Sequence, residues 1–125
     1  ASYSYGERII PQLNALITKL QKNKYSRGAL LTMPTVDDIK KVGRRVPCTV
    51  GYHFICRPTL HGDKLNLIVY QRSCDAINFF PLDFAKSVLL LQHIARETGL
   101  EVGYIIMAID SLHVYKKDVP ETSKW

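Results

Sequence analysis

The feature of this sequence that most constrains its fold is a pair of segments rich in Val, Ile, Tyr and Phe. They cover residues 47–56 and 64–71 and are separated by the stretch "RPTLHGDK". β-Branched and aromatic residues favour strands, whereas Pro58 and the Gly-Asp pair at 62–63 favour a turn. The pattern therefore predicts an antiparallel hairpin with a loose connecting loop.

Two further segments have the periodicity of helices. Residues 9–22 repeat Ile and Leu on one helix face, which predicts an amphipathic helix. Residues 84–98 predict a second helix, with the leucines at 89–91 in the core and Gly99 in the C′ position that ends it. Both helices are long enough to cover a sheet formed by the hairpin.

Shorter elements complete the chain. Residues 29–33 predict a short buried strand, and Thr35 and Asp38 have the spacing of a capping box at the start of a helical turn. Residues 101–115 predict a last strand and residues 116–125 an exposed tail. No repeat or internal linker interrupts this order, so the sequence predicts one mixed α+β domain.

Composition limits the class of protein. A chain of 125 residues with 46% hydrophobic and 22% charged residues is ordinary for one soluble domain with a real core. Its apolar runs are too short to span a bilayer, and its polar, aromatic start gives no sign of a signal peptide. The net charge of +6 suggests an anionic partner, either nucleic acid or a nucleotide or phosphate.

The cysteines predict neither a disulfide framework nor a zinc site. Their number is odd, and Cys48, Cys56 and Cys74 form no CxxC motif and no pairing with spaced histidines. Reduced thiols in a cytoplasm are the simplest interpretation. Cys48 follows Arg44 and Arg45 closely, so cations there would lower its pKa and favour a nucleophile. The residues alone favour a buried structural cysteine instead, because cysteine is among the most buried residue types.

Other candidate site residues also have two interpretations. Arg72 and Ser73 follow a predicted strand directly and suit a phosphate, as does Arg27, but single arginines are more often solvated surface charges. Asp83 stands where it can cap the helix that follows. A further pair alternates along the last strand and faces one side, where it can bind a sugar or lie half-buried: His113 and Tyr115.

Taken together, five runs resemble one family. They are "VPC", "YQRSCD", "PLDFA", "TGLEVG" and "DSLHVY", and their order and spacing resemble the thymidylate synthase and deoxycytidylate hydroxymethylase superfamily from about residue 5 to residue 115. The resemblance implies a mixed sheet packed with helices, in a chain shorter than a full family member at both ends. It also implies a one-carbon transferase that uses 5,10-methylenetetrahydrofolate.

The resemblance implies a role for each candidate residue. Cys48 matches the nucleophile that adds to C6 of the pyrimidine, after which C5 attacks the one-carbon group. Arg72 and Ser73 match phosphate ligands, and Arg27 matches an arginine supplied by the neighbouring subunit of a homodimer. The remaining matches are Gln71, which shapes the site; Asp75 and Phe79 at the folate, where Phe79 replaces a glycine; and His113 and Tyr115 at the sugar hydroxyl.

The resemblance also gives Asp83 a second role. The matching position is Asn in thymidylate synthases, where the amide matches O4 and N3–H of uracil, and Asp in the hydroxymethylases. A carboxylate accepts from N4–H of cytosine and from a protonated N3. The leading expectation is therefore a hydroxymethylase that converts dCMP or CMP to its 5-hydroxymethyl derivative. The alternatives are a divergent synthase converting dUMP to dTMP and a catalytically incomplete nucleotide-binding fragment; a basic nucleic-acid-binding domain lacks the expected aromatic–basic stripe.

Overall fold

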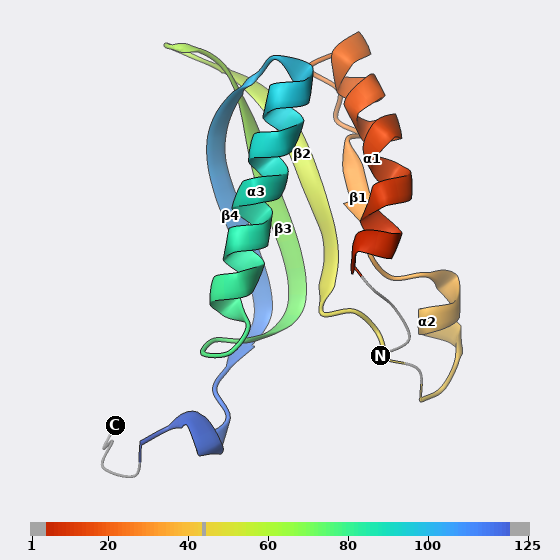
Figure 1. Cartoon of the computed structure of the whole chain (residues 1–125), viewed down its shortest axis with the longest axis vertical. Helices are drawn as coiled ribbons and strands as arrows, with labels where there is room; N and C mark the ends of the chain where they lie inside the picture. The colour runs from red at the N-terminus through yellow and green to blue at the C-terminus, as the bar shows by residue number, and fades with distance from the viewer. Residues whose placement is uncertain (1–4, 44, 121–125) are drawn as a thin grey trace.

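The structure is a computed structural model that describes residues 5–43 and 45–120, with a four-stranded sheet and its main helices on one face (Figure 1). Arg44 and residues 121–125 of the predicted tail lie outside the described residues. The elements are α1 (Tyr5–Lys22), β1 (Leu30–Thr32), α2 (Val36–Lys40), β2 (Thr49–Thr59), β3 (Gly62–Asp75), α3 (Phe80–Thr98), β4 (Glu101–His113) and the 3-10 turn η1 (Lys116–Asp118). The α+β class predicted from the sequence is confirmed.

The strands lie in the order β1-β2-β3-β4. The first three are antiparallel, whereas β4 runs parallel to β3. A parallel neighbour requires a crossover, and α3 supplies it by packing against both β3 and β4. The crossover returns the chain so that the carboxyl ends of β3 and β4 meet at one end of the sheet, the lower end in Figure 1.

The core lies between the sheet and the two long helices. Alternate residues of β3, namely Leu65, Leu67 and Val69, are almost completely buried, as expected for a strand with one covered face. From α3, Leu91 is completely buried but Leu89 is 66% exposed. The prediction that all three leucines at 89–91 belong to the core was therefore wrong, because consecutive helix residues point in different directions.

The predicted hairpin is confirmed, but its loop is tight rather than loose. β2 and β3 stay paired out to Thr59 and Gly62, which leaves only residues 60–61 in the turn. Gly62 has a φ of 103°, a region that favours glycine, and the Thr59 hydroxyl donates to its carbonyl at 2.6 Å. Pro58 is accommodated in a strand because the described partner of β2 on its other edge, β1, pairs only with residues 51–53.

Both long helices begin earlier than their apolar periodicity predicts. α1 starts at Tyr5 rather than at residue 9, and α3 starts at Phe80 rather than at residue 84. Pro81 lies in the first turn of α3, where its missing N–H removes no helical hydrogen bond. The first turn of α1, residues 5–8, is mostly polar, so repeated Ile and Leu do not reveal it, although Tyr5 packs against the core.

The capping box and the short elements are confirmed. The Thr35 hydroxyl accepts from the Asp38 N–H, and the Thr35 N–H donates to the Asp38 carboxylate at 2.8 Å, so the shorter Asp performs the reciprocal bond. The predicted last strand ends at His113, not at residue 115. The tail is partly held, because Asp118 accepts a hydrogen bond of 2.9 Å from the Asn78 side chain.

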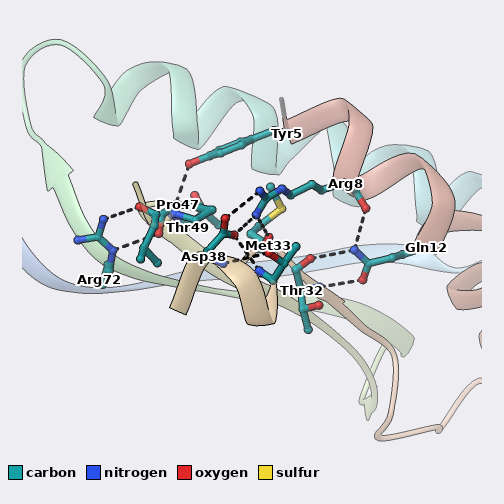
Figure 2. A network of polar contacts seen from close by, with 11 residues as sticks. Tyr5, Arg8, Gln12, Thr32, Met33, Asp38, Pro47, Thr49 and Arg72 are labelled. Carbon is teal, nitrogen blue, oxygen red and sulfur yellow. Dashed lines mark hydrogen bonds and ion pairs between the residues drawn. The ribbon is translucent and has the colours of Figure 1, made fainter. Parts of the chain in front are cut away.

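Side chains of α1 join this helix to β1 and α2 (Figure 2). Arg8 forms an ion pair with the completely buried Asp38 carboxylate and donates to the Met33 carbonyl at 2.6 Å. Gln12 donates to the Thr32 carbonyl at 2.8 Å and accepts from its N–H at 2.9 Å. These contacts fix the N-terminal half of α1 beside the end of β1 and the buried carboxylate of α2.

Candidate active site

A pocket of about 470 Å³ lies at the end of the sheet where β2 begins and where β3 and β4 end. The first turn of α3 and the first residue of α1 close its sides. Its lining residues are Tyr5, Arg45, Cys48, Ser73, Cys74, Asp75, Phe79, Asp83, Lys86, His113 and Tyr115. Most of the side chains that the sequence singles out therefore meet here, although they come from five separate segments.

Cys48 is the most accessible thiol of the protein. It is half-buried at the pocket, whereas Cys56 and Cys74 are buried, and all three are free. Burial raises the pKa of Cys56, and burial together with the nearby Asp83 carboxylate raises the pKa of Cys74 to about 11. Of the three thiols, Cys48 alone combines access to the pocket with a place at a strand start, which agrees with its predicted role as nucleophile.

Asp83 does not cap the helix, so that sequence interpretation was wrong. The N-cap of α3 is Phe79, which forms no side-chain cap, and Asp83 lies inside the first turn. Its carboxylate points toward β3, where Oδ2 accepts from Gln71 Nε2 at 3.0 Å and from the Cys74 thiol at 3.7 Å. Its Oδ1 has no hydrogen-bond donor among the described residues. One carboxylate oxygen is thus held by the protein and the other remains an acceptor at the pocket.

Gln71 lies beneath the pocket and supports Asp83 rather than lining the cavity. Its side chain is buried, and Nε2 also donates to the Thr49 hydroxyl at 3.2 Å. Its Oε1 is a buried atom for which no hydrogen-bond partner is found within residues 5–43 and 45–120. The amide therefore ties the start of β2 to the first turn of α3, across the width of the site.

Arg72 and Ser73 lie within β3, not after it as the sequence predicted, because the strand continues to Asp75. Ser73 lines the pocket, but Arg72 does not. The Arg72 guanidinium donates instead to the carbonyls of Pro47 at 3.1 Å and Val46 at 2.5 Å (Figure 2). Arg72 therefore holds the segment just before Cys48, and its predicted role as a phosphate ligand stays a prediction.

Arg27 lies beside the middle of β2, away from the pocket, with its backbone carbonyl 3.1 Å from His53 Nε2. It belongs to the α1–β1 connection, in which Lys24 and Tyr25 both contact the Asp63 carboxylate at the hairpin, at 2.6 and 2.8 Å. That hairpin lies at the upper end in Figure 1, away from Cys48. Within one chain Arg27 therefore cannot reach the pocket, which agrees with the expectation that it serves a neighbouring subunit.

Asp75 shapes the connection between β3 and α3. Its Oδ1 accepts from the N–H groups of Ile77 and Asn78 at 3.0 and 3.1 Å, and its Oδ2 accepts from the Asn78 side chain at 2.8 Å. These bonds, the Asn78 side-chain bond above all, hold the pKa of Asp75 below its ordinary value. The turn carries Phe79, which lines the pocket with its side chain 57% exposed.

His113 and Tyr115 meet at the β4 side of the pocket. Their rings form an edge-to-face pair with centroids 5.1 Å apart. Tyr115 lies just beyond the strand, so the two side chains converge through the bend after His113 rather than through strand alternation. The prediction that they face one site agrees with their common place in the pocket lining.

Sequence reasoning missed four lining residues: Tyr5, Arg45, Cys74 and Lys86. The Tyr5 hydroxyl accepts from the Thr49 N–H at 3.4 Å, and the Lys86 ammonium lies 5.1 Å from the centroid of the Tyr5 ring. Lys86 follows Asp83 by three positions, a spacing that would have placed both on one helix face once the helix start was known. Tyr5 precedes Ile9 by four positions, a helical spacing that would have extended α1 to Tyr5 had aromatic residues been counted with Ile and Leu.

No cluster of His, Cys, Asp and Glu side chains suited to a metal ion is found in the part of the chain that the structure describes. In the same residues, no helix has both the length and the apolar character needed to cross a membrane.

Comparison with known proteins decides the family. The sequence model described as thymidylate synthase matches residues 3–124. The chain belongs to the thymidylate synthase family. Curated thymidylate synthases from Buchnera aphidicola subsp. Acyrthosiphon pisum (strain APS) and subsp. Baizongia pistaciae (strain Bp) are each 30% identical to it, over 92% and 94% of this chain. The thymidylate synthase of Mycoplasma genitalium (strain ATCC 33530 / DSM 19775 / NCTC 10195 / G37) is 29% identical over 90% of this chain.

The chain spans well under half the length of these relatives, namely 42% of each Buchnera protein and 37% of the Mycoplasma protein. The resemblance to the superfamily is thus confirmed across nearly the whole chain. These relatives are synthases, and none of them gives specific support to the hydroxymethylase branch.

Proposed function

We propose that this chain carries the nucleotide-reacting part of a folate-dependent transferase that adds a one-carbon group to C5 of a pyrimidine nucleotide. The observation that carries the proposal is the meeting of Cys48 and Asp83 in one pocket, with Ser73, His113 and Tyr115 around them. A nucleophilic thiol beside a group that reads the base edge is what activation of a pyrimidine at C6 requires. The family membership supports the same chemistry.

The protein steps follow from these positions. The Cys48 thiolate forms a bond to C6, and the electron pair of the C5–C6 double bond moves to C5, which becomes nucleophilic. Asp83 fixes the edge of the ring, and the His113–Tyr115 pair is placed to hold the sugar. C5 then forms a bond to an electrophile, a solvent proton in exchange or the one-carbon group in transfer. A base removes the original C5 proton, and its electron pair re-forms the C5–C6 double bond as the Cys48 thiolate leaves.

The pocket also has features that fit a folate. The Phe79 ring is largely exposed at the pocket and offers a face on which a flat heteroaromatic ring stacks. Asp75 has each oxygen already engaged, and its place in this proposal is to hold the turn that presents Phe79. Methylenetetrahydrofolate, when bound, supplies the one-carbon group at the oxidation level of formaldehyde.

The first candidate substrate is dUMP, converted to dTMP. Forming the methyl group also requires a hydride, which the tetrahydrofolate would supply when bound. It is supported by the names of the relatives, all of which are thymidylate synthases. In this candidate the free Oδ1 of Asp83 accepts from N3–H of uracil.

The second candidate is dCMP or CMP, converted to its 5-hydroxymethyl derivative. It is favoured by the geometry of Asp83, whose Oδ2 is held by donors from Gln71 and Cys74. The carboxylate therefore presents acceptor capacity alone, which matches the amino group of cytosine better than O4 of uracil. Because Oδ2 already accepts twice, we expect Oδ1 to make the main contact with the base.

We also propose that the chain functions as a homodimer. The face of the sheet opposite the helices is uncovered, and it carries the exposed side chains Val50, Tyr70, Val102, Tyr104 and Ile106. A contiguous apolar face of this kind is typical of protein–protein contact. A dimer would also bring the distant Arg27 to another chain, where its predicted phosphate role becomes geometrically feasible. Sedimentation of the wild type and of Tyr104→Glu tests the proposal, and a monomeric wild type would contradict it.

Release of tritium from [5-³H]dUMP and [5-³H]dCMP tests the proposed function directly. Exchange at C5 needs only Cys48 addition and recognition of the base, so it is measured with and without methylenetetrahydrofolate. Release from dUMP supports the synthase, and release from dCMP that moves toward dUMP in Asp83→Asn supports the hydroxymethylase. No release from either nucleotide, together with no covalent adduct between Cys48 and a 5-fluoropyrimidine nucleotide, would leave a catalytically incomplete fragment.

A further inference from the structure

Two cations line the pocket without an assigned role. The side chains of Arg45 and Lys86 form neither a hydrogen bond nor an ion pair with any of the residues that the structure describes. Both side chains border the cavity that contains Cys48. We propose that Arg45 and Lys86 form a subsite that binds an oxyanion of a ligand, a phosphate or a carboxylate group. The inference deepens the proposed function and rests on it for the source of that oxyanion.

Lys86 is held at the pocket without losing its donors. It lies three positions after Asp83 on α3, so both side chains project from the same side of the helix. Its ammonium lies 5.1 Å from the centroid of the Tyr5 ring, and Tyr5 is itself fixed through its hydroxyl to the Thr49 N–H. A cation above an aromatic face is oriented by the ring but keeps its N–H groups for a stronger acceptor.

The backbone that carries Arg45 is fixed by hydrogen bonds from Arg72. Arg45 comes three positions before Cys48, and the intervening carbonyls of Val46 and Pro47 both accept from Arg72. Arg72, which the sequence offers as a phosphate ligand, thus uses its guanidinium to fix the segment that carries Arg45. The Arg45 side chain is exposed and keeps its planar set of donors, a geometry that suits phosphate and carboxylate oxygens.

The carboxylates in the pocket do not neutralise these cations. Asp75 accepts from Ile77 and Asn78 with both of its oxygens, and Asp83 Oδ2 accepts from Gln71 and Cys74. Neither forms an ion pair with a cation within residues 5–43 and 45–120. An entering oxyanion would therefore gain charge-assisted hydrogen bonds from Arg45 and Lys86 without displacing an existing partner.

The subsite lies on the β2 side of the pocket, beside Tyr5, whereas the His113–Tyr115 pair lies on the β4 side. Two ligands of the proposed reaction carry an oxyanion: the nucleotide has its 5′-phosphate and the folate has its glutamyl carboxylates. The chemistry of recognition is the same for both, and binding measurements with matched ligands separate them.

Alkylation of Cys48 tests the subsite without any turnover. The Cys48 thiolate displaces iodide from iodoacetate and from iodoacetamide, so the thiolate fraction cancels in the ratio of the two alkylation rates. Because only iodoacetate carries a charge, the ratio reports the electrostatic potential beside Cys48. We expect Arg45→Gln and Lys86→Gln each to lower the iodoacetate-to-iodoacetamide ratio about two- to fivefold, and added salt to lower it in the wild type. Peptide mass spectrometry confirms that Cys48 carries the label.

Arg96→Gln is the matched control, because it removes the same charge from the last turn of the same helix. We expect it to leave the ratio unchanged. An unchanged ratio in the Arg45→Gln/Lys86→Gln double variant would overturn the subsite, whatever the protein catalyses.

Calorimetry then identifies the ligand. The wild type and the variants are titrated with dUMP and deoxyuridine, and with methylenetetrahydrofolate carrying one or three glutamates. If the nucleotide phosphate occupies the subsite, we expect each substitution to weaken dUMP binding about tenfold and to leave deoxyuridine binding unaffected. If a glutamyl carboxylate occupies it, we expect each substitution to weaken binding of the folates about tenfold and to leave dUMP binding unaffected. Equal affinities in wild type and double variant for every ligand would overturn the inference.

Failure of the proposed subsite can be distinguished from failure of the proposed function. A wild type that binds and exchanges nucleotide, with no response of either assay to the double variant, leaves the proposed function standing and removes the subsite. A Cys48 alkylation ratio that responds to the variants, in a protein that neither binds nor exchanges a pyrimidine nucleotide, keeps the subsite and removes the proposed function.

Discussion

The two ends of the sheet carry similar residues in opposite states. At the hairpin end, Lys24 and Tyr25 both contact Asp63, so the charges of Lys24 and Asp63 satisfy one another. At the pocket end, Arg45 and Lys86 have no partner among the described residues, and Asp83 keeps one oxygen free. Charges that satisfy one another stabilise a turn, whereas charges left unsatisfied in a cavity are available to a ligand. The contrast separates structural from functional charges without reference to residue type.

The thiols give the strongest test of this contrast, because Cys48 lies at the pocket end and Cys56 toward the hairpin end. Cys48→Ser is expected to abolish C5 tritium exchange, a loss of about a thousandfold or more, since a serine hydroxyl is a far weaker nucleophile at neutral pH. Cys56→Ser, toward the hairpin end of β2, should keep the exchange rate within about twofold and cost only stability. Equal loss in both variants would mean that unfolding, not chemistry, explains the effect.

Ion pairs sharpen the comparison in terms of stability. Asp38→Ala near the pocket end leaves Arg8 buried without its carboxylate, and we expect the free energy of unfolding to fall by about 3–5 kcal/mol. Glu101→Ala breaks the pair with Lys64 near the hairpin end, where Glu101 is largely exposed, and should cost about 0–1 kcal/mol. Urea denaturation measures the free energy of unfolding of both variants. Similar losses would contradict the conclusion that the Asp38 pair is buried and the Glu101 pair is exposed.

Two Asp→Asn variants compare the carboxylate at the pocket, Asp83, with the carboxylate at the hairpin, Asp63. Asp83→Asn should change the ratio of dCMP to dUMP exchange roughly 10- to 100-fold, because an amide replaces one acceptor by a donor at the base edge. Asp63→Asn changes the charge equally at the hairpin and should leave the ratio unaltered. A shift of the ratio in Asp63→Asn would show that net charge, not contact with the base, sets the preference.

The smallest effect is expected from pH. The hydrogen bonds from Lys24 and then Tyr25 hold the pKa of Asp63 below its ordinary value. A lowered pKa contributes stability above the unfolded value of about 3.9, and this contribution is lost as the pH falls through the folded pKa. Asp63→Asn should therefore lower Tm slightly at pH 7 and converge with the wild type in acid. A gap that widens in acid would reverse the sign and contradict this account.

The sequence predicted the elements and the family well because those depend on periodicity and residue type. The hairpin, the capping box at Thr35 and the grouping of Cys48 with Asp83 all follow from local patterns or from the resemblance. The sequence predicted less well which hydrogen bonds each polar side chain forms. Asp83 was expected to cap a helix that in fact begins at Phe80, and no local pattern reports which way its carboxylate turns.

Arg72 shows the same limit of sequence-based prediction, because a residue predicted to bind a ligand instead bonds to the protein's own backbone. Its type and position suit a phosphate, but its donors bind the carbonyls of Val46 and Pro47. This contact joins β3 to the segment that precedes β2, and it depends on the pairing of the two strands. Lys86 and Tyr5 became site residues only through the packing of α1 against the start of β2. Satisfaction of hydrogen bonds is a property of three-dimensional arrangement, and it is what distinguishes a ligand-binding cation from a structural one.

The bonds between Gln12 and Thr32 have a consequence for how the protein meets other chains. β1 is the outermost strand, and an outermost strand offers unpaired N–H and C=O groups that recruit strands from other molecules. Gln12 occupies both groups of Thr32 with one side-chain amide, as a neighbouring strand would. A helix side chain thereby closes the edge of a very short strand, which disfavours edge-to-edge pairing through β1. The proposed homodimer would accordingly use the broad apolar face rather than this edge.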